Sequence, residues 1–416
     1  MKGNADLERV VYVVSLFPCW SETFIVREIS ALLDSGVDVR IVSLKAPTET
    51  LVQGDAAAML DRVRHPGSAA GMLRGLSLAL LRHPIAVPAA FAAVVADSWR
   101  RPSVLAKSFA ALLRGLEQLP WLREFDPQLI HAHWATYPST VAWALGRILG
   151  KPFGFTCHAH DIFVERQLLA RKLSDASLAV TISRYNIDWL SHTVSPAAAA
   201  KLKVVHCGVD LATGVSSNGT PASAAERDPQ AILAVGRLDP IKGFDTLVDA
   251  LAMLHARGVR ARCRLVGSGP LQAALQAQAG ARGVTHMLEF CGAQEQSVVR
   301  RWMREATLFV MPSRVARDGN RDGIPVALME AMASGCGVVS TRVSGIPELI
   351  EDHENGRLVE PGNAAALADA MQSLLDDEAT RTRLASAARQ RIEQQFDARR
   401  EALRLRGYMR EAAHGA

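Results

Sequence analysis

Short apolar segments alternate with amphipathic ones along most of the chain. Residues 10–16, 37–44 and 153–157 are rich in Val, Ile and Phe, which is typical of buried strands, whereas 24–33 and 139–149 carry apolar residues at helical spacing. Further strands are predicted at 128–133, 178–182 and 203–207. Strands that alternate with helices in this way form a parallel sheet with helices on both faces.

The same alternation begins again in the second half of the chain. A strand is expected at 231–236, a helix at 244–254, and further strands at 263–267, 308–311 and 337–341. Between them, the stretch up to residue 229 is rich in Ala, Thr, Gly, Ser, Asn and Pro, as linkers are. We therefore predict an α/β protein with two doubly wound, Rossmann-like domains that face each other across a cleft. The predicted boundaries are 1–212, a linker at 213–229, 230–395, and a C-terminal helix at 396–416.

The bulk composition limits the class of protein. The chain has 416 residues, of which 49% are hydrophobic, so it is long enough for two ordinary domains. Its six cysteines form no C-x-x-C pair, and residues 1–10 are polar, which favours a cytoplasmic protein without a secretory signal. The longest apolar run, near 85–96, contains Pro88 and is shorter than the roughly 20 residues that span a bilayer.

Positive charge is concentrated in one region. From Arg62 to Arg123 there are nine Lys and Arg residues against two acids, Asp97 and Glu117, on helices with apolar faces. Such helices can lie on the anionic inner face of the cytoplasmic membrane, although an ordinary solvated outer face has the same pattern. Nucleic acid is not expected as a partner, because no aromatic residues are interleaved for base stacking.

Two cations follow the first strand of the second half. Arg237 and Lys242 lie between this strand and the helix that starts at Phe244, so both are expected beside a helix N-terminus at the carboxyl edge of the sheet. An Arg fork and a Lys point charge suit a diphosphate. The small-residue turn at Ser344-Gly345, after another strand, offers further backbone N–H groups to a phosphate.

Two carboxylates stand eight positions apart later in the chain. Asp322 begins the turn Asp-Gly-Ile-Pro, and Glu330 lies among apolar residues early in the helix that Pro325 introduces. A carboxylate in an apolar helix needs a partner, either within the core or in a ligand.

The first half carries polar residues at the ends of its strands. His131 and His133 end one strand, and His158, His160 and Asp161 follow the next, so both groups are expected at one edge of the sheet. Acid–base chemistry, contact with sugar hydroxyls and structural hydrogen bonding remain open. A metal site is not expected, because nothing fixes the remaining ligands. Ser21 and Glu22 open the first helix, where Ser21 is a suitable N-cap and also faces the cleft.

The segment Val266–Pro270 imitates a dinucleotide fingerprint. Gln272 occupies the place of the third glycine, and the strand is not the first of its domain. We interpret it as a tight turn, which leaves an NAD-dependent dehydrogenase with little support.

Taken together, these motifs resemble the family-4 retaining glycosyltransferases of the GT-B fold over nearly the whole chain. The family pattern E-G-[FI]-P-x4-E-A-M-A-x-G is similar to Asp322–Gly335, and G-R-L-x3-K-G to Gly236–Gly243. The family's P-S turn and T-x-H motif correspond to Pro312–Ser313 and Thr156–His158.

The resemblance implies a role for each matching residue. Arg237 and Lys242 would hold the donor diphosphate and stabilise it as it leaves, Glu330 would bind the ribose hydroxyls and Asp322 the donor sugar. His158 would lie near the reacting centre. Ser21, Glu22, His133, His160 and Asp161 remain candidates for contact with the acceptor or the cleft.

The resemblance also implies the partners and the cofactor requirement. The domain at 230–395 would bind a UDP- or GDP-sugar, the domain at 1–212 the acceptor, and the helix at 396–416 would pack back on the first domain. No metal or other cofactor is expected, because two cations supply the charge. The segments 21–25 and 157–163 are similar to those of exopolysaccharide enzymes of the colanic-acid type, which implies a polyprenyl-linked glycan as acceptor.

Two departures keep alternatives open. Asp322 replaces the family's Glu, and Phe17–Glu22 replaces its usual Gly-Gly. A sugar phosphorylase or epimerase of the same fold is one alternative. A non-catalytic partner that binds nucleotide sugar or glycan in a polysaccharide assembly complex is the other.

Overall fold

The chain folds into two compact units. The computed structural model describes residues 6–19, 22–47, 54–211 and 227–415. Unit 1 comprises residues 1–206 and 399–416, and unit 2 comprises 207–398. Unit 1 therefore ends earlier than the predicted boundary at 212, and it is built from both ends of the chain. Most of the predicted linker lies outside the described residues.

Unit 1 contains a seven-stranded parallel sheet of order β3-β2-β1-β4-β5-β6-β7. Its central strands are buried apart from Arg9 at the start of β1, as their runs of apolar residues predict. The strands are β1 (Arg9–Val14), β2 (Asp38–Ser43), β3 (Val63–Arg64), β4 (Leu129–His133), β5 (Phe153–Cys157), β6 (Leu178–Thr181) and β7 (Leu202–Val204).

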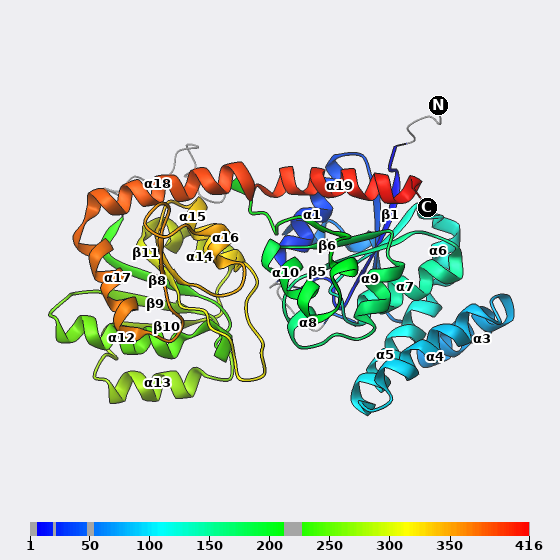
Figure 1. Ribbon diagram of the computed structural model, residues 1–416, viewed down its shortest axis with the longest axis horizontal. Coiled ribbons are helices and arrows are strands. Elements are labelled where there is room, and N and C mark those ends of the chain that lie inside the picture. Colours follow the sequence, from blue (N-terminus) through cyan, green and yellow to red (C-terminus); the bar gives the residue numbers. More distant parts are fainter. Residues whose placement is uncertain (1–5, 20–21, 48–53, 212–226, 416) are drawn as a thin grey trace. The chain divides into compact units, whose positions relative to one another are not determined.

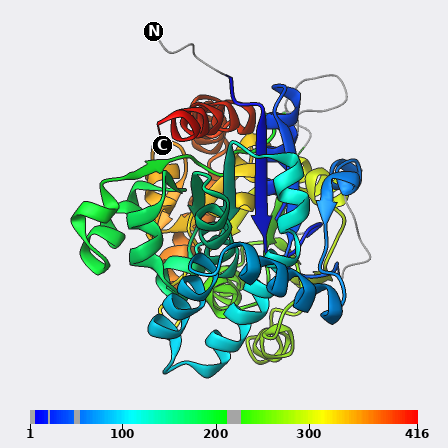
Figure 2. The same ribbon diagram turned by 90° about the vertical axis from the view of Figure 1, so that its right-hand side faces the viewer.

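Helices cover both faces of this sheet (Figure 1). Helix α7 packs directly on β4 and β5, and α3, α4 and α5 form a further layer outside it, visible in Figure 2 in blue and cyan. The helices are α1 (Thr23–Asp34), α2 (Gly54–Ala57), α3 (Ala69–Arg82), α4 (Ala86–Ser98), α5 (Pro102–Glu117), α6 (Leu119–Phe125), α7 (Tyr137–Leu149), α8 (His160–Phe163), α9 (Leu169–Asp175), α10 (Arg184–Thr193), α11 (Pro196–Ala199) and α19 (Ala398–His414).

Helix α19 completes unit 1 with residues from the far end of the chain. Its buried Leu405, Met409 and Ala412 belong to the same apolar cluster as Val10 and Tyr12 of β1, and Figure 2 shows the helix in red beside that strand. The C-terminal helix expected at 396–416 corresponds to α19, which begins at Ala398, three residues after α18 ends at Gln395.

Unit 2 contains a six-stranded parallel sheet of order β10-β9-β8-β11-β12-β13. Its strands are β8 (Asp228–Val235), β9 (Arg262–Val266), β10 (Leu288–Gly292), β11 (Ala306–Met311), β12 (Gly337–Thr341) and β13 (Arg357–Val359). Its helices are α12 (Phe244–Ala256), α13 (Gln272–Ala281), α14 (Gln296–Glu305), α15 (Val326–Ala333), α16 (Ile346–Leu349), α17 (Ala364–Asp376) and α18 (Glu378–Gln395). Strand β8 begins inside the stretch that was predicted as linker.

The predicted doubly wound α/β fold is confirmed in both units. In each sheet the strand order reverses once, between β1 and β4 in unit 1 and between β8 and β11 in unit 2. Ligands of doubly wound sheets bind at the carboxyl ends of the strands beside such a reversal. Residues that follow β1 and β4 in unit 1, and β8 and β11 in unit 2, therefore lie where a ligand would bind.

Within the described residues, no single helix has both the length and the apolar character to cross a membrane. Helices α3 and α4 meet that test only when they are taken together, and they are bent by 114° at the break between them.

Candidate functional site

Lys242 and Asp322 meet at the strand reversal of unit 2. Lys242 follows β8 and Asp322 follows β11, and the Lys242 Nζ lies 2.7 Å from the Asp322 Oδ1. The hydroxyl of Ser313 donates to the other carboxylate oxygen at 2.7 Å. The Lys242 and Asp322 side chains are only 15% and 11% exposed. Two residues that sequence analysis named separately thus form one ion pair.

Two glycines make this approach possible. Gly243 has a φ of 64°, and a Cβ atom there would fall 2.0 Å from the carbonyl oxygen of Pro312. A Cβ atom on Gly236 would come within 3.2 Å of the Lys242 Cε. The absence of a side chain at Gly243, directly after Lys242, therefore allows the turn after β8 to lie against the turn after β11.

Arg237 is placed differently from Lys242. Its side chain is 69% exposed, and its Nε donates to the Asp239 Oδ2 at 2.6 Å. Asp239 itself is buried. Each of the two predicted cations therefore has a carboxylate partner, but only Lys242 is largely shielded from water.

Glu330 lies in the second turn of α15 and is half-buried. The amide of Gln296 on α14 is 3.5 Å from its Oε1. Pro325 occupies the N-cap position, one residue before the first helical residue. Gly345 lies after β12, the neighbour of β11, and Ser344 before it has a φ of 51°. The predicted donor residues thus follow three adjacent strands, β8, β11 and β12.

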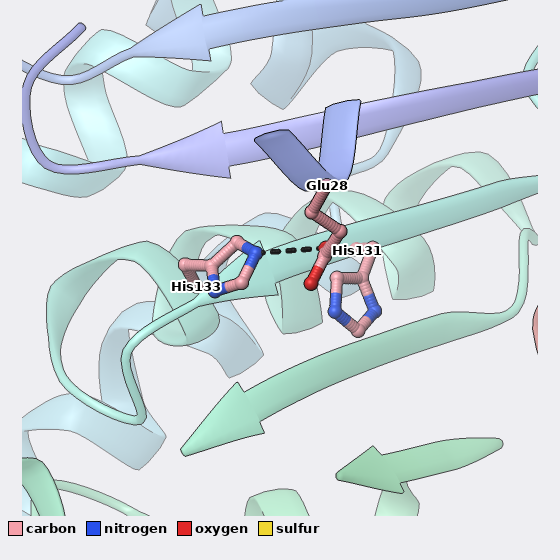
Figure 3. A group of neighbouring side chains, drawn as sticks. All are labelled: Glu28, His131 and His133. Atoms are coloured by element: carbon pink, nitrogen blue, oxygen red, sulfur yellow. Dashed lines mark hydrogen bonds and ion pairs between the residues drawn. The ribbon is translucent and has the colours of Figure 1, made fainter. Parts of the chain in front are cut away.

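In unit 1 a hydrogen-bonded chain connects His133 and His158. The His133 Nδ1 lies 3.1 Å from the His158 Nε2, and the His133 Nε2 lies 3.0 Å from the Glu28 Oε1. The hydroxyl of Tyr12 donates to the same Glu28 oxygen at 2.6 Å. Figure 3 shows Glu28 of α1 between the side chains of His131 and His133, which both come from β4.

These contacts shift the acidity of the groups. Burial raises the pKa of Glu28, but the charge of His133 and the hydrogen bonds from His133 and Tyr12 outweigh it, so the pKa is lowered. Burial, followed by the neighbouring histidines, lowers the pKa of His158 well below its usual range. Burial also lowers the pKa of His131 to about 3. His131 and His158 are therefore neutral at physiological pH.

Asp161 supports the turn around His158. Its carboxylate is fully buried and accepts hydrogen bonds from the backbone N–H groups of Ala135, at 2.7 Å, and His158, at 3.0 Å. Burial raises the pKa of Asp161, although these backbone hydrogen bonds lower it. Both carboxylate oxygens of Asp161 thus accept from backbone N–H groups, which gives the residue a role in holding this turn, while its contact with the acceptor or the cleft stays a prediction.

The other predicted residues of unit 1 are scattered. Glu22, rather than Ser21, is the N-cap of α1, and its Oε1 accepts a hydrogen bond from the indole of Trp134 at 3.1 Å. Ser21 lies outside the described residues. His160 opens α8 with an exposed ring, 4.0 Å from a Glu165 oxygen.

Sequence reasoning missed Glu28 and Lys172. The Lys172 Nζ is fully buried and lies within hydrogen-bond distance of four oxygens: Ala135 O (2.6 Å), Thr136 O (3.1 Å), Ser139 Oγ (2.9 Å) and Thr140 Oγ1 (3.2 Å). Both residues lie on the apolar stripe of a helix, Glu28 among the buried Ile25, Ile29 and Leu32, and Lys172 beside Leu169 and Leu173. A charged residue on the apolar stripe of a helix is the sequence signal that could have identified both.

Glu28, His131 and His133 bring three possible metal-ligand atoms within 4.8 Å of one another. The Glu28 Oε1 is already shared by Tyr12 and His133, and His133 uses both of its ring nitrogens. A metal ion would have to break these hydrogen bonds, so the donor set fits a hydrogen-bonded chain better than a metal.

Comparison with known proteins finds one family match in each half of the chain. The family described as "Glycosyltransferase Family 4" matches residues 21–213, and that described as "Glycosyl transferases group 1" matches residues 220–391. The amylovoran biosynthesis glycosyltransferase AmsK of Erwinia amylovora is 28% identical over 94% of this chain and 96% of its own length. The putative colanic acid biosynthesis glycosyltransferase WcaL of Escherichia coli is 29% identical over the same shares.

Solved structures show the same fold. A glycosyltransferase from Rickettsia africae superposes with a TM-score of 0.72 over 99% of this chain and all of its own, at 14% identity. Anabaena HepE in complex with UDP superposes with a TM-score of 0.68 over 96% of this chain and 98% of its own, at 19% identity. With one family matched in each half of the chain, the protein belongs to the family-4 glycosyltransferases of the GT-B fold.

Proposed function

We propose that the protein transfers a sugar, with retention of configuration, from a nucleotide-sugar donor to a growing lipid-linked exopolysaccharide glycan. The observation that carries the proposal is the Lys242–Asp322–Ser313 group at the strand reversal of unit 2. The names of AmsK and WcaL support the polysaccharide class, and the HepE complex with UDP supports a nucleotide-sugar donor.

The proposed chemistry needs positive charge where the diphosphate leaves. Lys242 and Arg237 would take up the diphosphate oxygens, Asp322 would bind hydroxyls of the sugar, and Glu330 would bind the ribose. The bond from the anomeric carbon to the phosphate oxygen breaks, and the bond to the acceptor oxygen forms on the same face. The leaving phosphate takes the proton of the acceptor hydroxyl. The two cations supply the charge, so we propose that the protein needs no metal.

The exposed surface of helices α3 and α4 supports a lipid-linked acceptor. Helices α3, α4 and their ends expose large apolar side chains together with several arginines. The apolar residues are Leu73, Leu81, Ile85 and Trp99, and the cations are Arg74, Arg82, Arg100 and Arg101. This pairing suits peripheral contact with an anionic membrane surface, where apolar side chains enter the interface and cations meet the headgroups.

The first test removes the donor contacts one at a time. Lys242→Ala and Glu330→Ala should each lower transfer from the preferred donor by roughly 10²-fold or more, because each removes a charge or hydrogen bond that stabilises the reacting complex. Lys201→Ala and Glu354→Ala change exposed residues of the same types and should leave the rate unchanged. Normal turnover in Lys242→Ala would show that the site is wrongly assigned.

A panel of UDP-, GDP- and ADP-sugars, assayed for binding and slow hydrolysis, separates the alternatives. We expect binding and hydrolysis with a UDP- or GDP-sugar. Binding without hydrolysis or transfer would favour a non-catalytic partner, and visible absorbance from pyridoxal phosphate would favour a phosphorylase.

A further inference from the structure

Unit 1 has an open pocket of about 770 Å³ whose lining residues are all different from those of the candidate site. The pocket lies between the C-terminal half of α4, the turn that joins α8 to α9, and the end of α10. More than half of its lining residues are apolar, with Val164, Leu168 and Leu169 among them. The charged residues of the lining are Asp97, Arg101, Arg166 and Arg171.

Asp97 holds two sides of the pocket together. Its Oδ1 accepts a hydrogen bond from the backbone N–H of Leu168 at 3.1 Å, and its Oδ2 accepts from the Ser98 hydroxyl at 2.7 Å. The same Oδ2 lies 3.1 Å from the Arg101 Nη2. Leu168 has a φ of 51°, a left-handed conformation that is uncommon for a residue with a side chain. The Asp97 carboxylate therefore fixes this turn, and Arg101 compensates its charge.

Arg166 and Arg171 are held in a different way. Both side chains are exposed, and neither forms an ion pair within the described residues. The guanidinium carbon of Arg166 lies 5.3 Å from the centre of the Trp189 ring, and that of Arg171 lies 5.9 Å from the centre of the Trp143 ring. An aromatic face orients a guanidinium group without neutralising its charge, so the N–H groups at its edge stay able to bind an anion.

The net charge and the apolar lining together indicate the class of ligand. The three arginines outnumber the one aspartate, so the lining carries a net positive charge that suits a phosphate or a diphosphate. A free phosphate gains nothing from the apolar residues, whereas a phosphate attached to a lipid does. On α4, Val95 and Trp99 flank the lining residues Ala96 and Asp97, and their side chains are 41% and 60% exposed. A lipid chain that leaves the pocket therefore finds apolar side chains beside it.

The pocket also lies near the proposed reacting centre. Val164 of the lining is six positions after His158, and the single-turn helix α8 lies between them. Six residues span at most about 22 Å, even when fully extended. A glycan of a few sugars, attached to a phosphate in the pocket, can therefore bring its far end to His158.

We propose that this pocket binds the phosphate or diphosphate group that joins the lipid to the glycan of the acceptor, through the guanidinium groups of Arg166 and Arg171. This rests on the proposed function, which supplies the lipid-linked acceptor. The apolar lining and the exposed apolar side chains of α4 would take up the first part of the lipid chain.

A binding measurement on the full chain tests the site without turnover. The probe is farnesyl diphosphate, titrated by calorimetry in the presence of saturating UDP, which fills the proposed donor site. The double variant Arg166→Gln/Arg171→Gln should raise the Kd by roughly 10-fold or more, because it removes two charge-assisted contacts. The matched control is Arg260→Gln/Arg410→Gln, which changes two exposed arginines elsewhere and should bind as the wild type does. Equal Kd values for the wild type and Arg166→Gln/Arg171→Gln would overturn the proposal.

Three further probes separate the lipid phosphate from its alternatives. Inorganic diphosphate should bind more weakly than farnesyl diphosphate, and any binding of farnesol should not change in the double variant. Inorganic diphosphate that binds as tightly as farnesyl diphosphate would show a site for free phosphate and overturn the lipid assignment. Vesicles of phosphatidylglycerol should bind both proteins similarly. A loss of vesicle binding as large as the loss for farnesyl diphosphate would place the arginines on a general membrane surface and overturn the pocket.

Transfer kinetics distinguish failure of this site from failure of the proposed function. With a diphosphate-linked lipid acceptor, the double variant should raise the acceptor KM by roughly 10-fold and leave kcat and the donor KM unchanged. An active wild type whose double variant keeps the acceptor KM would overturn the site alone. A wild type that binds farnesyl diphosphate through these arginines, but transfers no sugar from any donor, would overturn the proposed function and leave the site.

Discussion

At Lys172, burial and charge oppose each other. Burial lowers the pKa of its amine to about 7, although Asp161 and Asp97 raise it. The amine of the unfolded chain keeps its proton up to about pH 10, so between pH 7 and pH 10 the unfolded state binds more protons than the folded state. The free energy of unfolding should therefore rise with pH in this range. This gain in stability should be lost again as the pH falls to 7.

The measurement compares the wild type with Lys172→Met by urea denaturation at pH 7, 8 and 9. The free energy of unfolding of the wild type should rise relative to the variant by up to about 1.4 kcal/mol per pH unit. Lys201→Met, at an exposed position, should follow the wild type. If the difference stays constant with pH, the four oxygen partners keep the ammonium charged.

The sequence predicted which residues belong to the donor site, but not which of them contact each other. Lys242 and Asp322 were both expected in a donor site, yet their ion pair joins residues 80 positions apart, and sequence spacing carries no information on such a contact. Glu28 and His133 are 105 positions apart. The chain from Tyr12 to His158 became visible only when the sheet placed β1, β4 and β5 next to each other.

At the scale of an element, the turn between β8 and α12 depends on Gly243. Gly243→Ala would place a methyl group 2.0 Å from the Pro312 oxygen, so the turn after β8 and the turn after β11 must separate. We expect a loss of about 3 kcal/mol or more in the free energy of unfolding. Faster amide hydrogen exchange in peptides from residues 236–256 would show where the change acts.

Gly258→Ala is the matched control, because Gly258 also has a positive φ of 75° but no atom within 4 Å of the added methyl group. Its cost should be only the intrinsic cost of a left-handed conformation, about 1–2 kcal/mol. Equal losses in both variants would show that the contact with Pro312 is unimportant.

Central elements were predicted better than edge elements. Strands β5 and β12 were predicted with the bounds that the structure gives them, because their runs of apolar and small residues are buried on both faces. Strands β3, β10 and β13 were not predicted. They lie at the edges of the two sheets and contain two to five residues, with Arg or Glu among them. Such short, partly charged segments show no clear hydrophobic pattern from which a strand could be predicted.

At the scale of the molecule, unit 1 depends on a helix from the opposite end of the chain. Leu405 of α19 is fully buried in the apolar cluster that contains β1, whereas Leu403 on the same helix is 48% exposed. Leu405→Ala should lower the free energy of unfolding of unit 1 by about 2–5 kcal/mol, through the lost burial and the cavity left behind. Leu403→Ala, the same substitution two positions away, should change it by less than about 0.5 kcal/mol. Hydrogen exchange locates the effect: amides of β1 and β2 should exchange faster in Leu405→Ala, while those of β8 and β11 in unit 2 should not change. Faster exchange confined to unit 2 would contradict the assignment of α19 to unit 1.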